Sequence, residues 1–163
     1  MPAHPRTEAL TGVTREFVRY YEADPISNTF AFPGVKDVVT RFGAMGLKQA
    51  VCTNKFERPS RMILEHLKLM PPIIDVAGAD TFPVRKPDPK HILMLLERMG
   101  GSAERAVMVG DSIHDLEAAH AAGLPAVLVS WGYTDKPASE LGAEVVIEQF
   151  DALPRALEEI AGR

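Results

Sequence analysis

The feature that most constrains the fold is a series of short, mostly apolar runs separated by segments of helical periodicity. Four such runs lie at residues 49–53, 73–76, 105–110 and 125–130, and a weaker one lies at 144–147. Apolar runs without polar alternation are typical of strands that helices cover on both faces. The pattern therefore predicts an α/β fold with a parallel, Rossmann-like sheet, in which the weaker run forms an edge strand.

The segments between these runs place apolar residues at i, i+3 and i+4 spacings, which predicts helices. The expected helices cover residues 7–23, 35–42, 57–69, 88–99, 113–122 and 151–161. Pro89 is expected in the first turn of its helix, where a missing N–H costs nothing, and Gly100 and Gly101 end that helix. A loop from Asp24 to Gly34 breaks the pattern, so we divide the chain into residues 1–32 and residues 33–163.

Composition excludes several classes of protein. A chain of 163 residues is long enough to bury one core, and its net charge of −4 offers no basic surface for nucleic acid or an anionic membrane. No apolar stretch approaches the roughly 18–20 residues of a membrane span. The single cysteine, Cys52, lies in an apolar run and is expected to be an inert, buried thiol. These observations predict a cytoplasmic globular protein.

Polar residues follow the first run directly, as Thr53-Asn54-Lys55. Ligands of open parallel sheets bind beyond the carboxyl ends of the strands. A hydroxyl and an amide at a strand-to-helix turn can hold an anionic oxygen with help from backbone N–H groups. The alternative is that Thr53 or Asn54 simply caps the next helix.

A second cluster is Arg85-Lys86-Pro87-Asp88-Pro89. The two prolines restrict the backbone, so the Lys86 ammonium points in one direction and can neutralise a phosphoryl group. The alternative is a solvated loop lysine.

A third cluster follows the run at 105–110, where Gly110 precedes Asp111, Ser112 and Asp115. The two carboxylates lie one helical turn apart on the same side, and hard oxygen ligands of this kind suit Mg²⁺ better than zinc. The alternative is that Asp111 or Ser112 caps the helix and that Asp115 interacts favourably with the helix dipole.

In order and spacing, the three clusters resemble the second, third and fourth signature motifs of the haloacid dehalogenase (HAD) superfamily. Flanking residues are similar to its phosphoglycolate phosphatase branch, namely Phe32-Pro33-Gly34-Val35, Val51-Cys52, Gly78-Ala79-Asp80-Thr81-Phe82 and Ser130-Trp131-Gly132-Tyr133. Residues before 30 resemble the last part of that branch's helical cap. The resemblance implies that Thr53 and Asn54 bind phosphoryl oxygens, that Lys86 neutralises charge, and that Asp111 and Asp115 bind Mg²⁺. Gly110 and Ser112 have a supporting role.

The family also uses an Asp-x-Asp-Gly-Thr segment after a central strand, which supplies the nucleophile and the general acid–base. The sequence contains no Asp-x-Asp pair, and His114 and His120 are weak substitutes for the base. We therefore expect a truncated core that binds a phosphoryl group without supplying the nucleophile. Without the central strand, the strands at 49–53 and 105–110 either pair directly or leave an open edge that invites another chain.

The leading functional hypothesis is a phosphomonoester hydrolase, with 2-phosphoglycolate as substrate and glycolate and phosphate as products. A neighbouring alternative is another sugar-phosphate phosphatase or mutase of the superfamily. An alternative from a different class is a catalytically inactive phosphate-binding or interaction protein that forms a homo-oligomer through an exposed sheet edge. The expected partner is a small phosphorylated metabolite.

Overall fold

The computed structural model describes residues 24–132 and 134–162, and the chain divides into two units, residues 1–30 and residues 31–163. In the first unit the Asp24 carboxylate accepts a hydrogen bond from the backbone N–H of Ser27 at 3.0 Å, which closes a turn. The helix expected at 7–23 lies outside the described residues. The division at residue 32 and the interpretation of the preceding residues as a cap remnant stay predictions.

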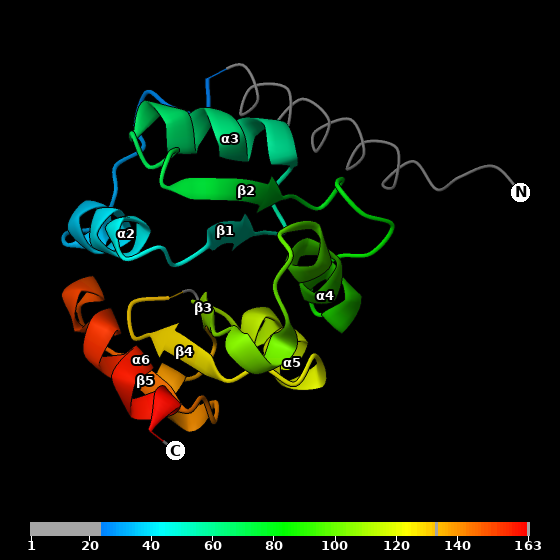
Figure 1. Ribbon diagram of the computed structural model, residues 1–163, viewed down its shortest axis with the longest axis vertical. Coiled ribbons are helices and arrows are strands. Elements are labelled where there is room, and N and C mark those ends of the chain that lie inside the picture. Colours follow the sequence, from blue (N-terminus) through cyan, green and yellow to red (C-terminus); the bar gives the residue numbers. More distant parts are fainter. Residues whose placement is uncertain (1–23, 133, 163) are drawn as a thin grey trace, which may run out of the picture. The chain divides into compact units, whose positions relative to one another are not determined.

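The second unit alternates helices and strands in the predicted order (Figure 1). Its α-helices are α2 (Val35–Ala44), α3 (Glu57–His66), α4 (Pro89–Arg98), α5 (Ile113–Ala121) and α6 (Leu153–Ala161). Its strands are β1 (Gln49–Cys52), β2 (Ile73–Ala77), β3 (Met108–Gly110), β4 (Ala126–Val129) and β5 (Val145–Ile147). Short 3₁₀ helices cover Ala103–Arg105, Ala138–Glu140 and Phe150–Ala152. In the part of the chain that the structure describes, no helix is long and apolar enough to cross a membrane.

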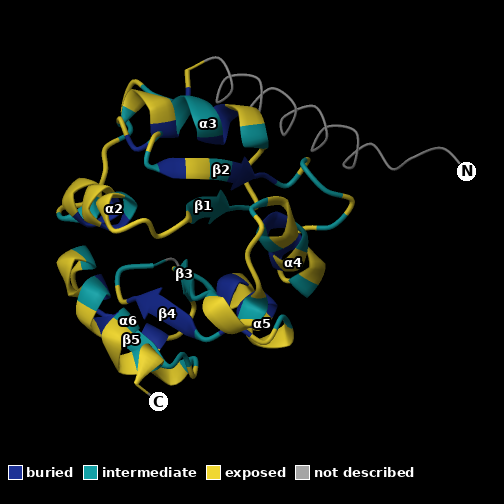
Figure 2. Cartoon of the chain, viewed as in Figure 1, coloured by how far each residue is buried: buried dark blue, intermediate teal, exposed yellow. Residues whose placement is uncertain are grey.

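All paired strands are parallel, as the sequence predicts, and β5 is an edge strand. Strand β4 lies at the centre of the core, and it is the strand that is buried along its whole length (Figure 2). Its side chains alternate between two faces, as a strand requires. Ala126 and Leu128 pack against α4 and α5, whereas Val127 and Val129 pack against α2 and α6. Helices therefore cover both faces of β4, which confirms the interpretation of its apolar run.

Strand β3 is shorter than predicted. The sequence indicates a strand over residues 105–110, but only Met108–Gly110 pair with β4. The preceding residues bond locally, because the N–H groups of Arg105 and Ala106 donate to carbonyls three residues back. Helix α3 also ends at His66, three residues before the predicted end.

The strands form two sheets rather than one, β1-β2 and β3-β4-β5. The backbone N–H of Thr53 donates to β2 and that of Met108 donates toward β4, at Pro125. Because alternate residues of a strand point their N–H groups to opposite sides, those of Ala50, Cys52 and Val109 face away from the paired neighbours. Among residues 24–132 and 134–162, β1 and β3 do not pair with each other, so of the two expected outcomes these residues show the open edges.

Candidate active site

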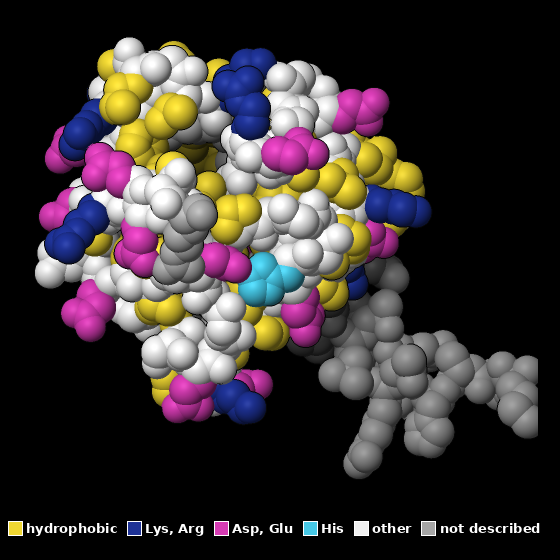
Figure 3. All heavy atoms as spheres, turned by 60° about the horizontal axis from the view of Figure 1, so that its bottom comes forward, with side chains coloured by type: hydrophobic (Ala, Val, Ile, Leu, Met, Phe, Trp, Pro, Cys, Tyr) yellow, Lys and Arg dark blue, Asp and Glu magenta, His cyan; other side chains and the backbone are white. Residues whose placement is uncertain are grey.

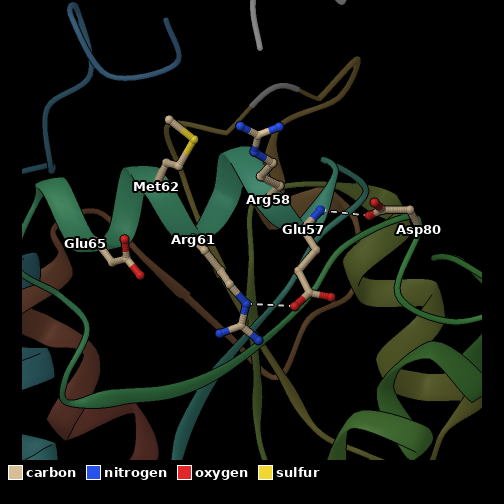
Figure 4. Close-up of a pocket in the computed structure, with 6 residues that line it drawn as sticks. All are labelled: Glu57, Arg58, Arg61, Met62, Glu65 and Asp80. Carbon is tan, nitrogen blue, oxygen red and sulfur yellow. Dashed lines mark hydrogen bonds and ion pairs between the residues drawn. The ribbon is translucent and has the colours of Figure 1, made fainter. Parts of the chain in front are cut away.

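The loop after β1 brings Thr53 and Asn54 to the carboxyl end of the sheet. The Thr53 hydroxyl oxygen accepts from the Lys55 backbone N–H at 3.1 Å, and the Asn54 amide donates to the Lys86 carbonyl oxygen at 2.9 Å. The interpretation of Thr53 or Asn54 as a helix cap is therefore wrong. The N-terminal residue of α3, Glu57, donates its N–H to the Asp80 carboxylate at 2.8 Å instead (Figure 4).

Lys86 is a buried cation, with only 8% of its side chain exposed. Its ammonium donates to the Cys52 carbonyl oxygen and to the Asp115 carboxylate, both at 2.5 Å. The alternative of a solvated loop lysine is therefore wrong. The following turn is rigid because Asp88 caps α4 by accepting from the Lys90 N–H at 2.9 Å, and Pro89 lies in the first turn as predicted.

Asp115 is saturated with donors. Its Oδ2 accepts from the N–H groups of Asp111 and Ser112, both at 3.0 Å, and from the Ser112 hydroxyl at 2.8 Å. Ser112 is the N-cap of α5 and forms a reciprocal capping box with Asp115, so the capping alternative is confirmed for Ser112 rather than for Asp111. A Cβ atom on Gly110 would lie 2.3 Å from the Asp115 Cβ atom. Only glycine therefore lets this carboxylate fold back over the end of β3.

The two carboxylates of this loop have different electrostatics. Burial alone would raise the pKa of Asp115, but the Lys86 ammonium and the hydrogen bonds from Ser112 and Asp111 lower it below its ordinary value. Partial desolvation and the neighbouring Asp115 charge raise the pKa of Asp111. Asp115 is therefore the ionised partner of Lys86, and the Asp111 side chain lies at the surface.

These contacts join the three sequence clusters into one site. Asn54 binds the loop of Lys86, Lys86 binds Asp115, and Asp115 binds the backbone of Asp111. Asp111 and Asp115 lie in the loop after β3 and in the first turn of α5, and Thr53 and Asn54 lie after β1. The structure therefore joins Asn54, Lys86, Asp115 and the backbone of Asp111, with Thr53 next to Asn54 in the chain, while their catalytic, substrate and metal roles stay predictions.

Sequence reasoning missed the role of the loop after β4. A Cβ atom on Gly132 would lie 2.1 Å from the Asp111 carbonyl oxygen, so this loop packs tightly against the backbone of Asp111. The neighbouring Trp131 contacts Phe32, with ring centroids 5.7 Å apart. The sequence indicated these residues only by their resemblance to a family, because nothing local reveals which backbone atom Gly132 approaches.

A hollow of about 460 Å³ lies elsewhere, along the exposed side of α3 (Figure 4). Its lining residues are Glu57, Arg58, Arg61, Met62, Glu65 and Asp80. Arg61 is already paired, with Glu57 at 2.7 Å and with Asp75 at 3.0 Å. None of these residues belongs to the cluster around Lys86, so the two places are distinct.

The chain matches the haloacid dehalogenase-like hydrolase family over residues 4–129, and it belongs to that family. This match confirms the resemblance inferred from the three clusters.

Within the family, the chain is 43% identical over 137 residues to the phosphoglycolate phosphatase of Rhodospirillum rubrum, which covers 84% of the chain and 57% of that relative. It is 42% identical over 143 residues to that of Mesorhizobium japonicum, covering 88% of the chain and 63% of the relative. The crystal structure of a predicted phosphoglycolate phosphatase from Haemophilus somnus superimposes with a TM-score of 0.82 at 26% identity, covering 88% of this chain and 64% of that chain. The chain thus spans less than two thirds of these proteins.

Proposed function

We propose that this chain forms the phosphoryl-binding core of a phosphatase that hydrolyses 2-phosphoglycolate to glycolate and phosphate. The observation that carries the proposal is the buried Lys86 ammonium, fixed between the Cys52 carbonyl oxygen and the Asp115 carboxylate. Burying a cation is costly unless it is paired, and Asp115 offsets that cost while leaving the ammonium at the carboxyl end of β1. Relatives named phosphoglycolate phosphatase at 43% and 42% identity support the choice of substrate.

The ammonium of Lys86 has a donor to spare. An ammonium carries three N–H groups, and within residues 24–132 and 134–162 only two acceptors bind this one. The third N–H is available to a phosphoryl oxygen. The Thr53 hydroxyl oxygen accepts from the Lys55 backbone N–H, and within the described residues its O–H has no acceptor, so we assign it to a second phosphoryl oxygen. Asn54 already donates to the Lys86 carbonyl oxygen and thereby orients the lysine loop.

Phosphatases of this family generally use Mg²⁺, and the acidic residues of the site partly fit that ion. Asp111 offers a hard oxygen ligand at the surface, whereas both oxygens of Asp115 already accept hydrogen bonds. Over the described ranges, no group of three histidine, cysteine or acidic side chains forms a complete metal site. Bound Mg²⁺ would neutralise charge on the phosphoryl group. Asp111 is the ligand that we propose for it, with Asp115 holding Lys86.

The sequence contains no Asp-x-Asp pair. The proposal therefore takes the attacking carboxylate from outside these 163 residues, and it assigns to this chain the binding and neutralisation of the phosphoryl group.

The test compares binding of inorganic phosphate in the presence of Mg²⁺, followed by ³¹P NMR, by the wild-type chain, by Lys86→Ala and by Lys90→Ala. Lys90 is an exposed lysine on α4 and controls for the change in net charge. We expect binding of inorganic phosphate to depend on Lys86 and not on Lys90. Equal binding by all three proteins would contradict the proposal.

A second candidate is a phosphate-binding protein that pairs with another copy of itself, and the open edges of β1 and β3 favour it. Exposed edges present unpaired N–H and C=O groups to other chains. The variant Ala50→Pro removes an N–H that faces away from β2, at the open edge. The control variant Val51→Pro removes an N–H that faces β2. We expect a homo-oligomer by light scattering that Ala50→Pro dissociates while the fold persists. A wild-type monomer would exclude this candidate.

A cytoplasmic location and a small phosphorylated metabolite as partner complete the proposal. Cys52 is of intermediate exposure rather than buried as expected, and desolvation raises the pKa of its thiol to about 11, which supports a protonated thiol at neutral pH. On the face in Figure 3, acidic and basic side chains are interspersed, without a continuous basic patch for a polyanion.

A further inference from the structure

His91 is a fully buried side chain of α4, with 0% exposure. Its Nε2 lies 3.1 Å from the Gly78 carbonyl oxygen, and its Nδ1 lies 3.6 Å from the Cys52 sulfur. A carbonyl oxygen only accepts, so Nε2 carries the proton and Nδ1 is left to accept from the thiol. Both ring nitrogens are therefore engaged, Nε2 by the backbone just after β2 and Nδ1 by a side chain of β1.

The segment from Lys86 to His91 contacts Cys52 at two places, its backbone and its side chain. The Cys52 carbonyl oxygen accepts from Lys86, and the Cys52 thiol faces His91. Lys86 precedes the cap of α4 and His91 lies in the first turns of that helix. The position of α4 against the end of β1 thus also sets the position of the Lys86 ammonium.

The hydrogen bond from His91 Nε2 to the Gly78 carbonyl oxygen connects the same segment to the loop after β2. Gly78 donates its N–H to the Thr81 hydroxyl at 2.8 Å, and Ala79 donates to the Lys55 carbonyl oxygen at 2.9 Å. His91 therefore links the segment of Lys86 to two loops at the carboxyl ends of β1 and β2.

We propose that His91 is a positioning residue, whose neutral ring holds the first turns of α4 against β1 and β2 so that the Lys86 ammonium points into the phosphoryl site. The inference rests on the proposed function, in which Lys86 binds the phosphoryl group. It predicts that the site loosens when the ring becomes charged, because Nδ1 would then present a donor to the thiol.

Three titratable groups near the His91 ring bear on whether the ring is charged. They are the Cys52 thiol from β1, the Lys86 ammonium from the preceding loop and the Asp88 carboxylate at the cap of α4. Burial lowers the pKa of His91 below its ordinary value, the nearby Lys86 lowers it further, and Asp88 opposes them. The ring is therefore neutral at neutral pH.

The first test reads the position of Lys86 directly, as its rate of acetylation by a soluble anhydride, measured by mass spectrometry. His91→Leu removes both contacts, His91→Gln keeps a donor for Gly78, and Leu95→Ala is a matched core change on the same helix. We expect Lys86 to react about tenfold faster in His91→Leu, the factor typical of a lost buried hydrogen bond, and near the wild-type rate in His91→Gln. Equal rates in His91→Leu and Leu95→Ala would overturn the proposal.

The second test measures the dissociation constant of inorganic phosphate across pH by ³¹P NMR. The ratio of the His91→Gln and wild-type constants cancels the ionisation of phosphate itself. As the pH falls below about 6.5, we expect wild type to lose affinity relative to His91→Gln. A ratio that does not change with pH would overturn the role of the neutral ring. Absence of phosphate binding in wild type would overturn the proposed function, whereas the acetylation rates would still decide the role of His91.

Discussion

The ion pairs of Lys86 and of Asp75 belong to two networks in the described part of the chain, and these networks differ in their access to water. In one, Lys86 and Asp115 lie 2.5 Å apart with only 8% and 5% of their side chains exposed. In the other, Asp75 binds Arg61 at 3.0 Å and Arg98 at 2.7 Å, with 34% and 38% of the arginine side chains exposed. The distances are similar, so the surrounding solvent decides what each network contributes.

Water screens the pairs of Asp75, and exposed pairs of this kind contribute about 0–1 kcal/mol each. The buried pair loses its hydration, which its mutual attraction offsets only when further hydrogen bonds satisfy both groups. Asp115 meets that condition with three donors besides Lys86. A buried pair adds little net stability over apolar residues, so we assign this one to the proposed role of Lys86 rather than to stability.

The largest expected effect comes from breaking the buried pair on one side. Asp115→Ala leaves the Lys86 ammonium buried without its counter-ion, and we expect a loss of about 3–5 kcal/mol in the free energy of unfolding, measured with urea. The double variant Lys86→Met/Asp115→Leu removes both charges and should recover most of that loss. A double variant as unstable as Asp115→Ala would show that the two residues act independently.

Gly110→Ala tests the close contact between Gly110 and the side chain of Asp115, the carboxylate that pairs with Lys86. The added methyl group would overlap the Asp115 side chain, and overpacking of this kind costs about 1–3 kcal/mol. Gly101→Ala is the control, because its added Cβ atom would meet Leu96 at an ordinary distance of 3.4 Å. Equal stability of the two variants would mean that the loop adjusts without moving the carboxylate.

The pH dependence of stability should report His91. Because burial lowers the pKa of His91 in the folded chain, the unfolded chain binds the proton first as the pH falls. Its contribution is complete above the ordinary value of about 6.5 and is lost as the pH falls below it. Denaturant titrations should show a shallower decline for His91→Gln than for wild type. Parallel curves would exclude a neutral, buried ring.

The smallest effect is expected in the exposed network. Asp75→Asn keeps an acceptor for the Val76 N–H but removes the charge between the two arginines, at a cost of about 1 kcal/mol or less. Concentrated salt should abolish the difference, since it screens exposed charges. A loss as large as that of Asp115→Ala would contradict the distinction between the two networks.

The sequence predicted the strands and helices well because burial imposes periodicity, as in the continuous apolar run of β4. It also predicted that the three polar clusters lie together, because the carboxyl ends of parallel strands meet at one edge, while the roles of Thr53, Lys86 and Asp111 stay predictions. It did not predict Asp80 at the start of α3 or His91 beneath Lys86. Both depend on contacts with residues at least 13 positions away, which no local pattern records.

The most direct measurement is a titration of inorganic phosphate followed by ³¹P NMR, with wild type and Lys86→Met/Asp115→Leu at matched stability. We predict saturable binding by wild type at one site, weakened by about tenfold or more in the double variant, as expected when a charged hydrogen bond is lost. Equal affinity of the two folded proteins would contradict the assignment of Lys86 to the phosphoryl group.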